Sequence, residues 1–255
     1  MIRFLILFGM IACALASFAQ ERLTVAAAAD LQSVLKEVAA QFEKETGSKV
    51  ELSFGSSGTF FAQIQNGAPY DVFFSADMDY PKKLETGGLG ESGSLYQYAT
   101  GKIVLWAPSA SGVDVSKGLG VVTDSAVRKL AIANPTHAPY GRAAEAALKK
   151  AGLWEKVSSK LVLGENISQA AQFVQSGNAD VGILALSLVL APAMKDKGRY
   201  FEIPQELYPP LQQAALILKN SKHKQTAHRF MEFIKTPEIK SLSRQHGFAV
   251  EEIVR

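Results

Sequence analysis

Hydroxyl-bearing residues and glycines gather in residues 54–77, FGSSGTFFAQIQNGAPYDVFFSAD, directly after an apolar run. Ser56, Ser57 and Gly58 have no base, metal-ligand type or cation beside them. The first backbone N–H groups of a helix have no partner within the helix, and the helix dipole gives that end a partial positive charge. Hydroxyls and glycine at such a helix start can therefore bind an anion without the help of a cation.

Four junctions of this kind each follow a predicted strand. They are AAAADL (26–31), GSSGT (55–59), NPTHAPYGR (134–142) and GENISQ (164–169). Ligands of open α/β sheets bind beyond the carboxyl ends of the strands, where the next helices begin. Each junction taken alone also has a plainer interpretation as a helix N-cap or a surface turn. Four of them facing one cleft favour an anion site.

Residue types suited to catalysis are sparse. FGSSG lacks the spacing of a G-x-S-x-G nucleophile elbow, because a single residue separates Gly55 from Ser57. His137 is the only histidine at a predicted strand end, so a secreted hydrolase that uses Ser57 with His137 stays as an alternative. No carboxylate pair stands out, and metal-type His/Cys spacing and a phosphate-binding loop are absent from the sequence.

Short apolar strands alternate with amphipathic helices along the chain. This alternation predicts parallel α/β sheets in which each helix crosses over between neighbouring strands. The helix after the first strand has one apolar stripe and is expected to end at Gly47. The strands expected in these units are residues 23–29, 49–54, 71–76, 128–134, 160–164 and 179–186.

Two further strands, KIVLWAP (102–108) and QAALILK (213–219), stand alone between the two sets of strand–helix units. We interpret them as the crossings between two lobes. The first lobe would then comprise residues 21–98 and 208–255, and the second would comprise residues 99–207. The predicted fold is a two-lobed α/β binding-protein fold, with mixed, mainly parallel sheets, helices on both faces and two hinge-crossing strands.

Residues 1–20 are typical of a secretory signal peptide, with Arg3 before an apolar run and a small-x-small end that places the cut after Ala19. A lipoprotein processed before Cys13 is the alternative. Removing the signal also removes the only cysteine and lowers the formal net charge from +3 to about +2, because Arg3 is its single charged residue. Such a mild charge argues against nucleic acid as a partner.

The junction segments resemble the periplasmic molybdate-binding proteins of molybdate ABC transporters, which belong to the type II solute-binding proteins. The resemblance covers essentially the whole mature chain, and FxSSGT combined with GAPxDVFxSAD is specific for that family. The segments that carry it are AAAADL, FGSSGT, QIQNGAPYDVFFSAD, NPTHAPYG, AGLWEKVSSKLVLGENISQA and NADVGILA. It implies a hinged two-lobed fold that holds a tetrahedral oxyanion, molybdate or tungstate, through neutral hydroxyls and backbone amides.

Carried over by position, the resemblance implies four contacts with molybdate, and it implies that molybdenum is bound only as this oxyanion. The four residues are Asp30, Ser57, Tyr140 and Ile167, the last through its amide. Three further residues would support the site: Ala29, Ser56 and Gly58. Some members of the family bring a tyrosine hydroxyl from the last strand, where this chain has Ala185, and Tyr140 is expected to replace that donor.

Asp30 departs from the usual serine or asparagine of that family. A carboxylate that faced a dianion at low effective dielectric would repel it by several kcal/mol. Our hypothesis is that Asp30 turns away to cap its own helix at residues 31–33 and offers the ligand only its backbone N–H. A protonated or cation-tolerant site is the alternative.

The resemblance further implies a periplasmic monomer that needs no cofactor and delivers its ligand to a membrane ABC permease with its ATPase. A receptor for sulfate or another tetrahedral oxyanion is the alternative within the same class. The effector lobe of a transcription regulator shares this fold type, but the export signal and the lack of a helix-turn-helix segment argue against it.

Overall fold

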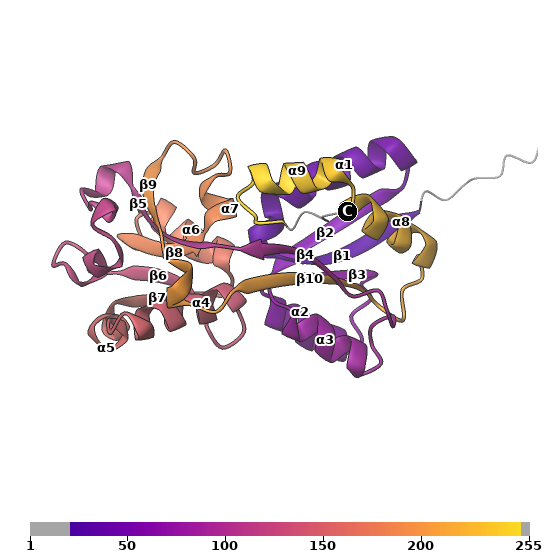
Figure 1. Ribbon diagram of the computed structural model, residues 1–255, viewed down its shortest axis with the longest axis horizontal. Coiled ribbons are helices and arrows are strands. Elements are labelled where there is room, and N and C mark those ends of the chain that lie inside the picture. The colour runs from indigo at the N-terminus through magenta and orange to yellow at the C-terminus, as the bar shows by residue number, and fades with distance from the viewer. Residues whose placement is uncertain (1–20, 251–255) are drawn as a thin grey trace, which may run out of the picture.

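The computed structural model describes residues 21–250 and contains two five-stranded sheets that lie side by side (Figure 1). The strand order is β2-β1-β3-β10-β4 in the first sheet and β7-β6-β8-β5-β9 in the second. We call each sheet with its helices a lobe; the first lobe is on the right in Figure 1. The predicted two-lobed α/β class is confirmed. The predicted signal peptide, with its alternative cuts at Ala19 and Cys13, lies outside the described residues.

In the first sheet β1, β2 and β3 are parallel, and β10 is antiparallel to both β3 and β4. Its strands are β1 (Arg22–Ala28), β2 (Lys49–Gly55), β3 (Val72–Ser75), β4 (Tyr96–Gly101) and β10 (Leu211–Ile217). Its helices are the 3₁₀ helix η1 (Ala29–Leu31) and α1 (Gln32–Thr46), α2 (Ser57–Gln65), α3 (Asp79–Thr86), α8 (Lys224–Ile234) and α9 (Pro237–Gln245). Gly47 ends α1 in the left-handed conformation, as predicted.

The second sheet repeats this plan, with β6, β7 and β8 parallel and β5 antiparallel to both β8 and β9. Its strands are β5 (Ile103–Pro108), β6 (Leu130–Ala133), β7 (Leu161–Gly164), β8 (Val181–Ala185) and β9 (Gly198–Glu202). Its α-helices are α4 (Pro139–Lys150), α5 (Trp154–Val157), α6 (Ile167–Gln175) and α7 (Leu186–Val189). Short 3₁₀ helices are η2 (Ser109–Ser111), η3 (Val115–Lys117), η4 (Leu119–Thr123), η5 (Ser158–Lys160) and η6 (Gln205–Leu207).

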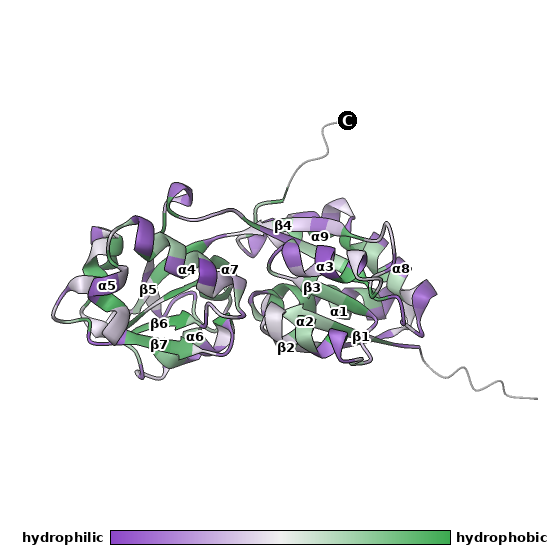
Figure 2. Cartoon of the chain, turned by 90° about the horizontal axis from the view of Figure 1, so that it is seen from below, coloured by the Kyte–Doolittle hydropathy of each residue, from purple (hydrophilic) through white to green (hydrophobic). Residues whose placement is uncertain are grey.

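Each sheet is apolar on both faces because helices cover both. Successive side chains of a strand point to opposite faces. In β1, Val25 and Ala27 join the cluster that contains Phe42 of α1, whereas Ala26 joins the cluster that contains Phe60 of α2. The inner strands β1, β3, β5 and β6 are accordingly green, hydrophobic, in Figure 2, whereas the edge strand β4 is white to pale purple. Burial on both faces explains why these strands are continuous apolar runs in the sequence.

The chain passes between the lobes twice. Only Lys102 separates β4 from β5 at the first passage, and residues 203–210 make the second, from β9 to β10. The sequence-based interpretation assigned the crossings to residues 102–108 and 213–219. In the structure these segments lie within the sheets as β5 and most of β10, because both are buried apolar runs that pair on either side, and the passages directly precede them.

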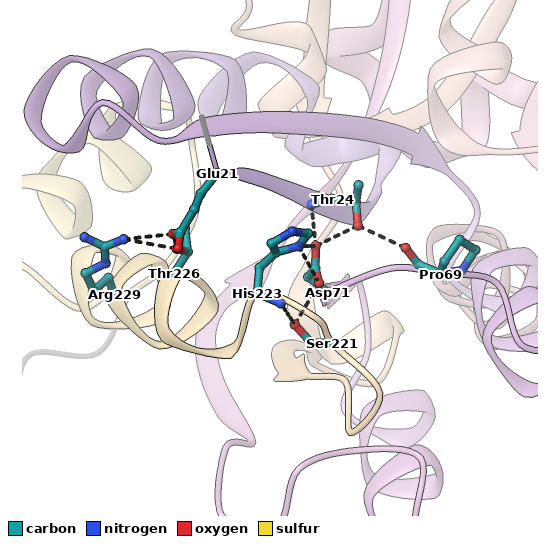
Figure 3. Close-up of polar contacts among 8 residues, drawn as sticks. All are labelled: Glu21, Thr24, Pro69, Asp71, Ser221, His223, Thr226 and Arg229. Atoms are coloured by element: carbon teal, nitrogen blue, oxygen red, sulfur yellow. Dashed lines mark hydrogen bonds and ion pairs between the residues drawn. The ribbon is translucent and has the colours of Figure 1, made fainter. Parts of the chain in front are cut away.

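A buried carboxylate, that of Asp71, connects strands of the first sheet with the segment before α8 (Figure 3). Asp71, before β3, accepts hydrogen bonds from the backbone N–H of Thr24 (2.7 Å), the Thr24 hydroxyl (2.8 Å) and the Ser221 hydroxyl (2.7 Å). Nδ1 of His223 lies 3.2 Å from its Oδ2. Burial alone would raise the pKa of Asp71, but these hydrogen bonds outweigh it and hold the pKa below its usual value. The carboxylate thus joins β1, β3 and the start of α8.

We expect Asp71→Asn to lower the free energy of unfolding by about 2–3 kcal/mol, because an amide offers one acceptor oxygen to several buried donors. Urea unfolding at pH 7 measures this loss. A depressed pKa contributes stability above the unfolded pKa of about 3.9 and loses it as pH falls through the folded pKa. The difference between wild type and variant should therefore shrink in acid. The exposed Asp196→Asn is the control, and an equal loss there would contradict this role for Asp71.

None of the helices in the part of the chain that the structure describes has the length and apolarity to cross a membrane.

Candidate anion-binding site

A small cavity lies between the lobes where the four predicted junctions meet. It contains six of the seven residues predicted for the site, and Gly58 is the one outside its lining. The lining residues are Ala28, Ala29, Asp30, Gly55, Ser56, Ser57, Ala76, Ala138, Pro139, Tyr140, Asn166 and Ile167. Asn166 lies next to Ile167 and is the N-cap of α6, where its side chain accepts a hydrogen bond from the amide of Gln169 (3.0 Å).

The sheet register explains why these junctions meet. In the first lobe β1 and β2 are parallel neighbours that end together, with Ala28 opposite Gly55. In the second lobe β6 and β7 are parallel neighbours, with Ala133 opposite Gly164. Each pair of strands therefore presents two helix starts at one sheet edge, and the cavity is lined from both lobes.

Helix starts supply the first donors. Ser57 and Ile167 are the first residues of α2 and α6, so neither backbone N–H has a partner within its helix. Both residues are buried. Two nine-residue helices therefore direct unpaired amides and the positive ends of their dipoles at one cavity.

The Ser57 hydroxyl is arranged as a donor. Its side chain is fully buried, and its Oγ accepts a hydrogen bond from the backbone N–H of Ala76 (2.9 Å). A serine hydroxyl has one hydrogen to donate, and no acceptor for it occurs among the described residues. The amide of Ala76 thus occupies a lone pair of Ser57 and leaves its hydrogen for a ligand.

Ser56 and Gly58 instead contact the second lobe. The Ser56 hydroxyl and the Gly58 amide both donate to the backbone oxygen of His137, at 2.7 and 2.9 Å. Ser56 Oγ also lies 2.9 Å from Nδ1 of His137. The hydrolase alternative required His137 to activate Ser57, but the imidazole contacts Ser56, so the geometry does not support that pairing.

Asp30 does not cap its helix, so the capping hypothesis is wrong. Neither η1 nor α1 has a side-chain cap. Instead Asp30 Oδ2 accepts hydrogen bonds from the Tyr140 hydroxyl (3.0 Å) and from Nε2 of Gln213 (2.9 Å). The side chain is 1% exposed, and its Oδ1 has no hydrogen-bond partner. Burial raises the pKa of Asp30 to about 6, although the hydrogen bonds from Gln213 and Tyr140 act in the opposite direction.

The Tyr140 hydroxyl is therefore engaged within the protein. It donates to Asp30 and accepts from Nε2 of Gln213 (3.0 Å), while Gln213 Oε1 accepts from the Tyr98 hydroxyl (2.9 Å). Burial, then the charge of Asp30, holds the pKa of Tyr140 well above its usual value, so the phenol stays neutral. Ala185, at the end of β8, is fully buried.

Gln213 belongs to this hydrogen-bond network but is absent from the predicted set. It is fully buried on β10 and connects the carboxylate of Asp30 with two phenols. The paired glutamines Gln212 and Gln213 interrupt an otherwise apolar strand, and that interruption is the signal in the sequence. A buried amide in a strand requires partners, and sequence alone does not say which.

Arg142, two residues after Tyr140 in the cavity lining, is a cation whose charge is neutralised by a carboxylate. Arg142 on α4 donates to Asp77 Oδ2 at 2.5 Å and lies over the Tyr80 ring at 5.4 Å. Burial raises the pKa of Asp77, partly offset by the Tyr80 amide and the Arg142 charge. The pair joins α4 of the second lobe to the first lobe. Within residues 21–250, no three His, Cys, Asp or Glu side chains are grouped to hold a metal ion.

Two lobes joined by two passages, with neutral donors from both lobes around one cavity, define a solute-binding protein. The chain belongs to the family described as bacterial extracellular solute-binding proteins, whose model matches residues 23–249.

Several relatives are similar over nearly the whole chain. The molybdate-binding protein ModA of Azotobacter vinelandii is 42% identical over 243 residues, which are 95% of this chain and 94% of the relative. The ModA of Rhodobacter capsulatus is also 42% identical, over 89% of this chain and 87% of the relative. The solved structure of the periplasmic molybdate-binding protein of A. vinelandii superimposes with a TM-score of 0.84 at 38% identity, and covers 90% of this chain and all of its own.

Proposed function

We propose that this protein is the substrate-binding component of a molybdate ABC transporter, and that it binds molybdate or tungstate in the cavity between its lobes. The observation that carries the proposal is the convergence of four junctions on one cavity, with donors at the starts of α2 and α6, in a chain 42% identical to molybdate-binding proteins. Ser57 would donate its hydroxyl and Ile167 its amide. Asp30 and Tyr140 would complete the lining, with Ala29 and Ser56 beside them.

Such a site stabilises a dianion without a counter-ion. Hydrogen bonds to a charged acceptor are roughly twice as strong as neutral ones, and helix ends add a fixed favourable field. The donors also discriminate between oxyanions, because a proton still carried by the anion would find no partner among them, at a cost of about 1–3 kcal/mol, unless Asp30 as a carboxylate accepts it. Hydrogen phosphate meets this barrier, whereas molybdate, tungstate and sulfate do not.

Closure of the lobes couples binding to transport. The ligand gains all its donors only when α2 of the first lobe and α4 and α6 of the second approach it together, so binding favours the closed form. A membrane permease with its ATPase would then recognise that form. The protein would act as an exported monomer, released from its signal after Ala19, and would require neither a cofactor nor a chemical step.

Calorimetric titration of the ligand-stripped mature protein with molybdate, tungstate, sulfate and phosphate tests the proposal. We expect one-to-one binding of the first two, with sulfate at least about a hundredfold weaker, a difference of about 2.7 kcal/mol. Sulfate binding as tight as molybdate binding would retain the oxyanion receptor but reject the named ligand. Absence of binding by all four anions to folded protein would contradict the proposal.

A further inference from the structure

We infer that Asp30 enters the ligand-bound state as a neutral carboxylic acid, so that the protein takes up one proton from solvent with each oxyanion it binds. The inference rests on the proposed function and deepens it. It makes Asp30 a hydrogen-bond donor of the site, in place of a charge that opposes binding.

The position of Asp30 leaves little room for a carboxylate beside an anion. Asp30 lines the cavity together with Ser57 and Ile167, and the residue is 1% exposed. A dianion in that cavity would be close to a charge that water cannot screen. The same carboxyl group as a neutral acid would carry no charge and would add a donor.

The hydrogen bonds of Asp30 specify which oxygen takes the proton. Oδ2 accepts from both Tyr140 and Gln213, so it stays an acceptor. The Gln213 amide is oriented with its Nε2 toward Asp30, because a carboxylate oxygen can only accept a hydrogen bond. Oδ1 is buried without a hydrogen-bond partner, and it is therefore the oxygen to be protonated. Its O–H would find an acceptor in an oxygen of the bound ion, which satisfies the one unpaired atom of the network.

Most elements around Asp30 bring no ionisable group to it. η1 packs against α1, α6, α7 and β2, and the side chain of Asp30 meets β10 through Gln213. The helices α6 and α7 and the strand β10 contain no ionisable residue. The first ionisable residue of α1 is Lys36, whose Nζ lies 6.0 Å from the Phe54 ring. Lys49 and Glu51 of β2 pair with Glu43 and Arg22, near the other end of that strand.

The groups that do face Asp30 do not neutralise it. Tyr140 is buried and Tyr98 is half-buried, and desolvation of their hydroxyls together with the Asp30 charge keeps the pKa of each phenol well above its usual value. The guanidinium of Arg142, on α4, is taken by Asp77. Without a cation to stabilise the carboxylate, a proton is the available means of removing its charge.

Linkage gives the direction of the pH dependence. In the closed lobes burial raises the pKa of Asp30 from 3.8 to about 6, and a dianion beside it would raise the pKa further. The bound state would therefore hold more protons than an open state in which Asp30 meets solvent. Binding is strongest below the open-state pKa and weakens as pH rises through the bound-state pKa. A difference of two units between the bound-state and open-state pKa of Asp30 corresponds to about a hundredfold loss of affinity across that pH range. The affinity falls by at most about tenfold per pH unit.

The test is calorimetric titration with molybdate between pH 5.5 and 8.5, in pairs of buffers that differ in ionisation enthalpy. Wild type should take up between a half and one proton per ion at pH 6 and bind more weakly as pH rises. Asp30→Asn should bind without proton uptake and with nearly constant affinity, because its amide imitates the neutral acid: its oxygen accepts from Tyr140 and Gln213, and its NH₂ group replaces the Oδ1 hydroxyl.

Two variants control for other titratable groups at the cleft. Asp77→Asn and His137→Gln should keep the proton uptake, whatever their affinities. Uptake that persists in Asp30→Asn, or that disappears in either control, would overturn the inference. Wild-type binding with no uptake would also overturn it and leave the proposed function intact, whereas absence of binding at every pH would reject the proposed function itself. If Asp30→Asn fails to fold, infrared spectroscopy of the wild type replaces it. Appearance of the band of a protonated carboxyl group on addition of molybdate would support the inference, and its absence would overturn it.

Discussion

Replacing Ser57 by aspartate is expected to lower the affinity for molybdate by at least about a thousandfold. Ser57 is fully buried at the first position of α2, with its oxygen held by the Ala76 amide. A carboxylate there would exchange a donor for a negative charge at the cavity. Two unit charges 4 Å apart repel by about 4 kcal/mol at an effective dielectric of 20, and a dianion roughly doubles this. Calorimetric titration with molybdate at pH 7.5 measures the loss.

Two variants separate charge from shape at this position. Thr59→Asp places the same charge in the first turn of the same helix, but on an exposed residue, and should change affinity less than threefold. Ser57→Ala removes one hydrogen bond to a charged acceptor and should weaken binding by about 1.5–3 kcal/mol, or roughly 10- to 150-fold. Thermal unfolding without ligand checks that each variant folds. If Ser57→Asp bound molybdate within tenfold of wild type, Ser57 would not contact the ligand.

Most of the fold follows from local patterns in the sequence. Continuous apolar runs bounded by glycine or polar junctions predict buried parallel strands, and helices of about ten residues between them predict crossovers. The N-cap at Thr236, whose hydroxyl accepts from the Ile239 amide, and the stop at Gly47 are also local signals. The strands β4 and β9 are absent from the prediction, because each lies at a sheet edge, where one side is open and polar residues are tolerated.

The partners of Asp30 could not be predicted in this way. A carboxylate at the start of a helix is commonly an N-cap, and that local preference produced the wrong hypothesis. The actual partners are Tyr140, 110 residues away, and Gln213, 183 residues away, one in each lobe. The approach of the second lobe brings Tyr140 to Asp30, and the strand order of the first sheet brings Gln213. The sequence therefore identified which residues line the cavity but not which of them bond to one another.

The same limit applies to Gly58, which the sequence suggests as a ligand-side residue. The structure places it against the opposite lobe, where a Cβ would lie 2.6 Å from the backbone oxygen of His137 and 2.9 Å from its Cβ. Its amide donates to that same oxygen. Gly58 is therefore a point of close approach between the lobes, and a larger side chain there should hinder their closure.

Gly58→Ala is expected to weaken molybdate binding by about 1–3 kcal/mol, or roughly 5- to 150-fold, because the added methyl group holds the lobes apart. The ligand could then form hydrogen bonds with the donors of one lobe only by losing those with the donors of the other. Alanine within a helix is favoured over glycine by up to about 1 kcal/mol, so the ligand-free variant should be no less stable to heat. A loss of affinity without a loss of stability separates blocked closure from a damaged fold.

Small-angle scattering provides the second measurement for this variant. Molybdate should reduce the radius of gyration of wild type and reduce that of Gly58→Ala less. Gly120→Ala is the matched control, because a Cβ at this exposed glycine meets no atom within 4 Å. It should bind and contract like wild type. If Gly58→Ala bound molybdate and contracted as wild type does, the lobes would not need this close approach, and the donors of α2 would have to reach the ligand in a less tightly closed cleft.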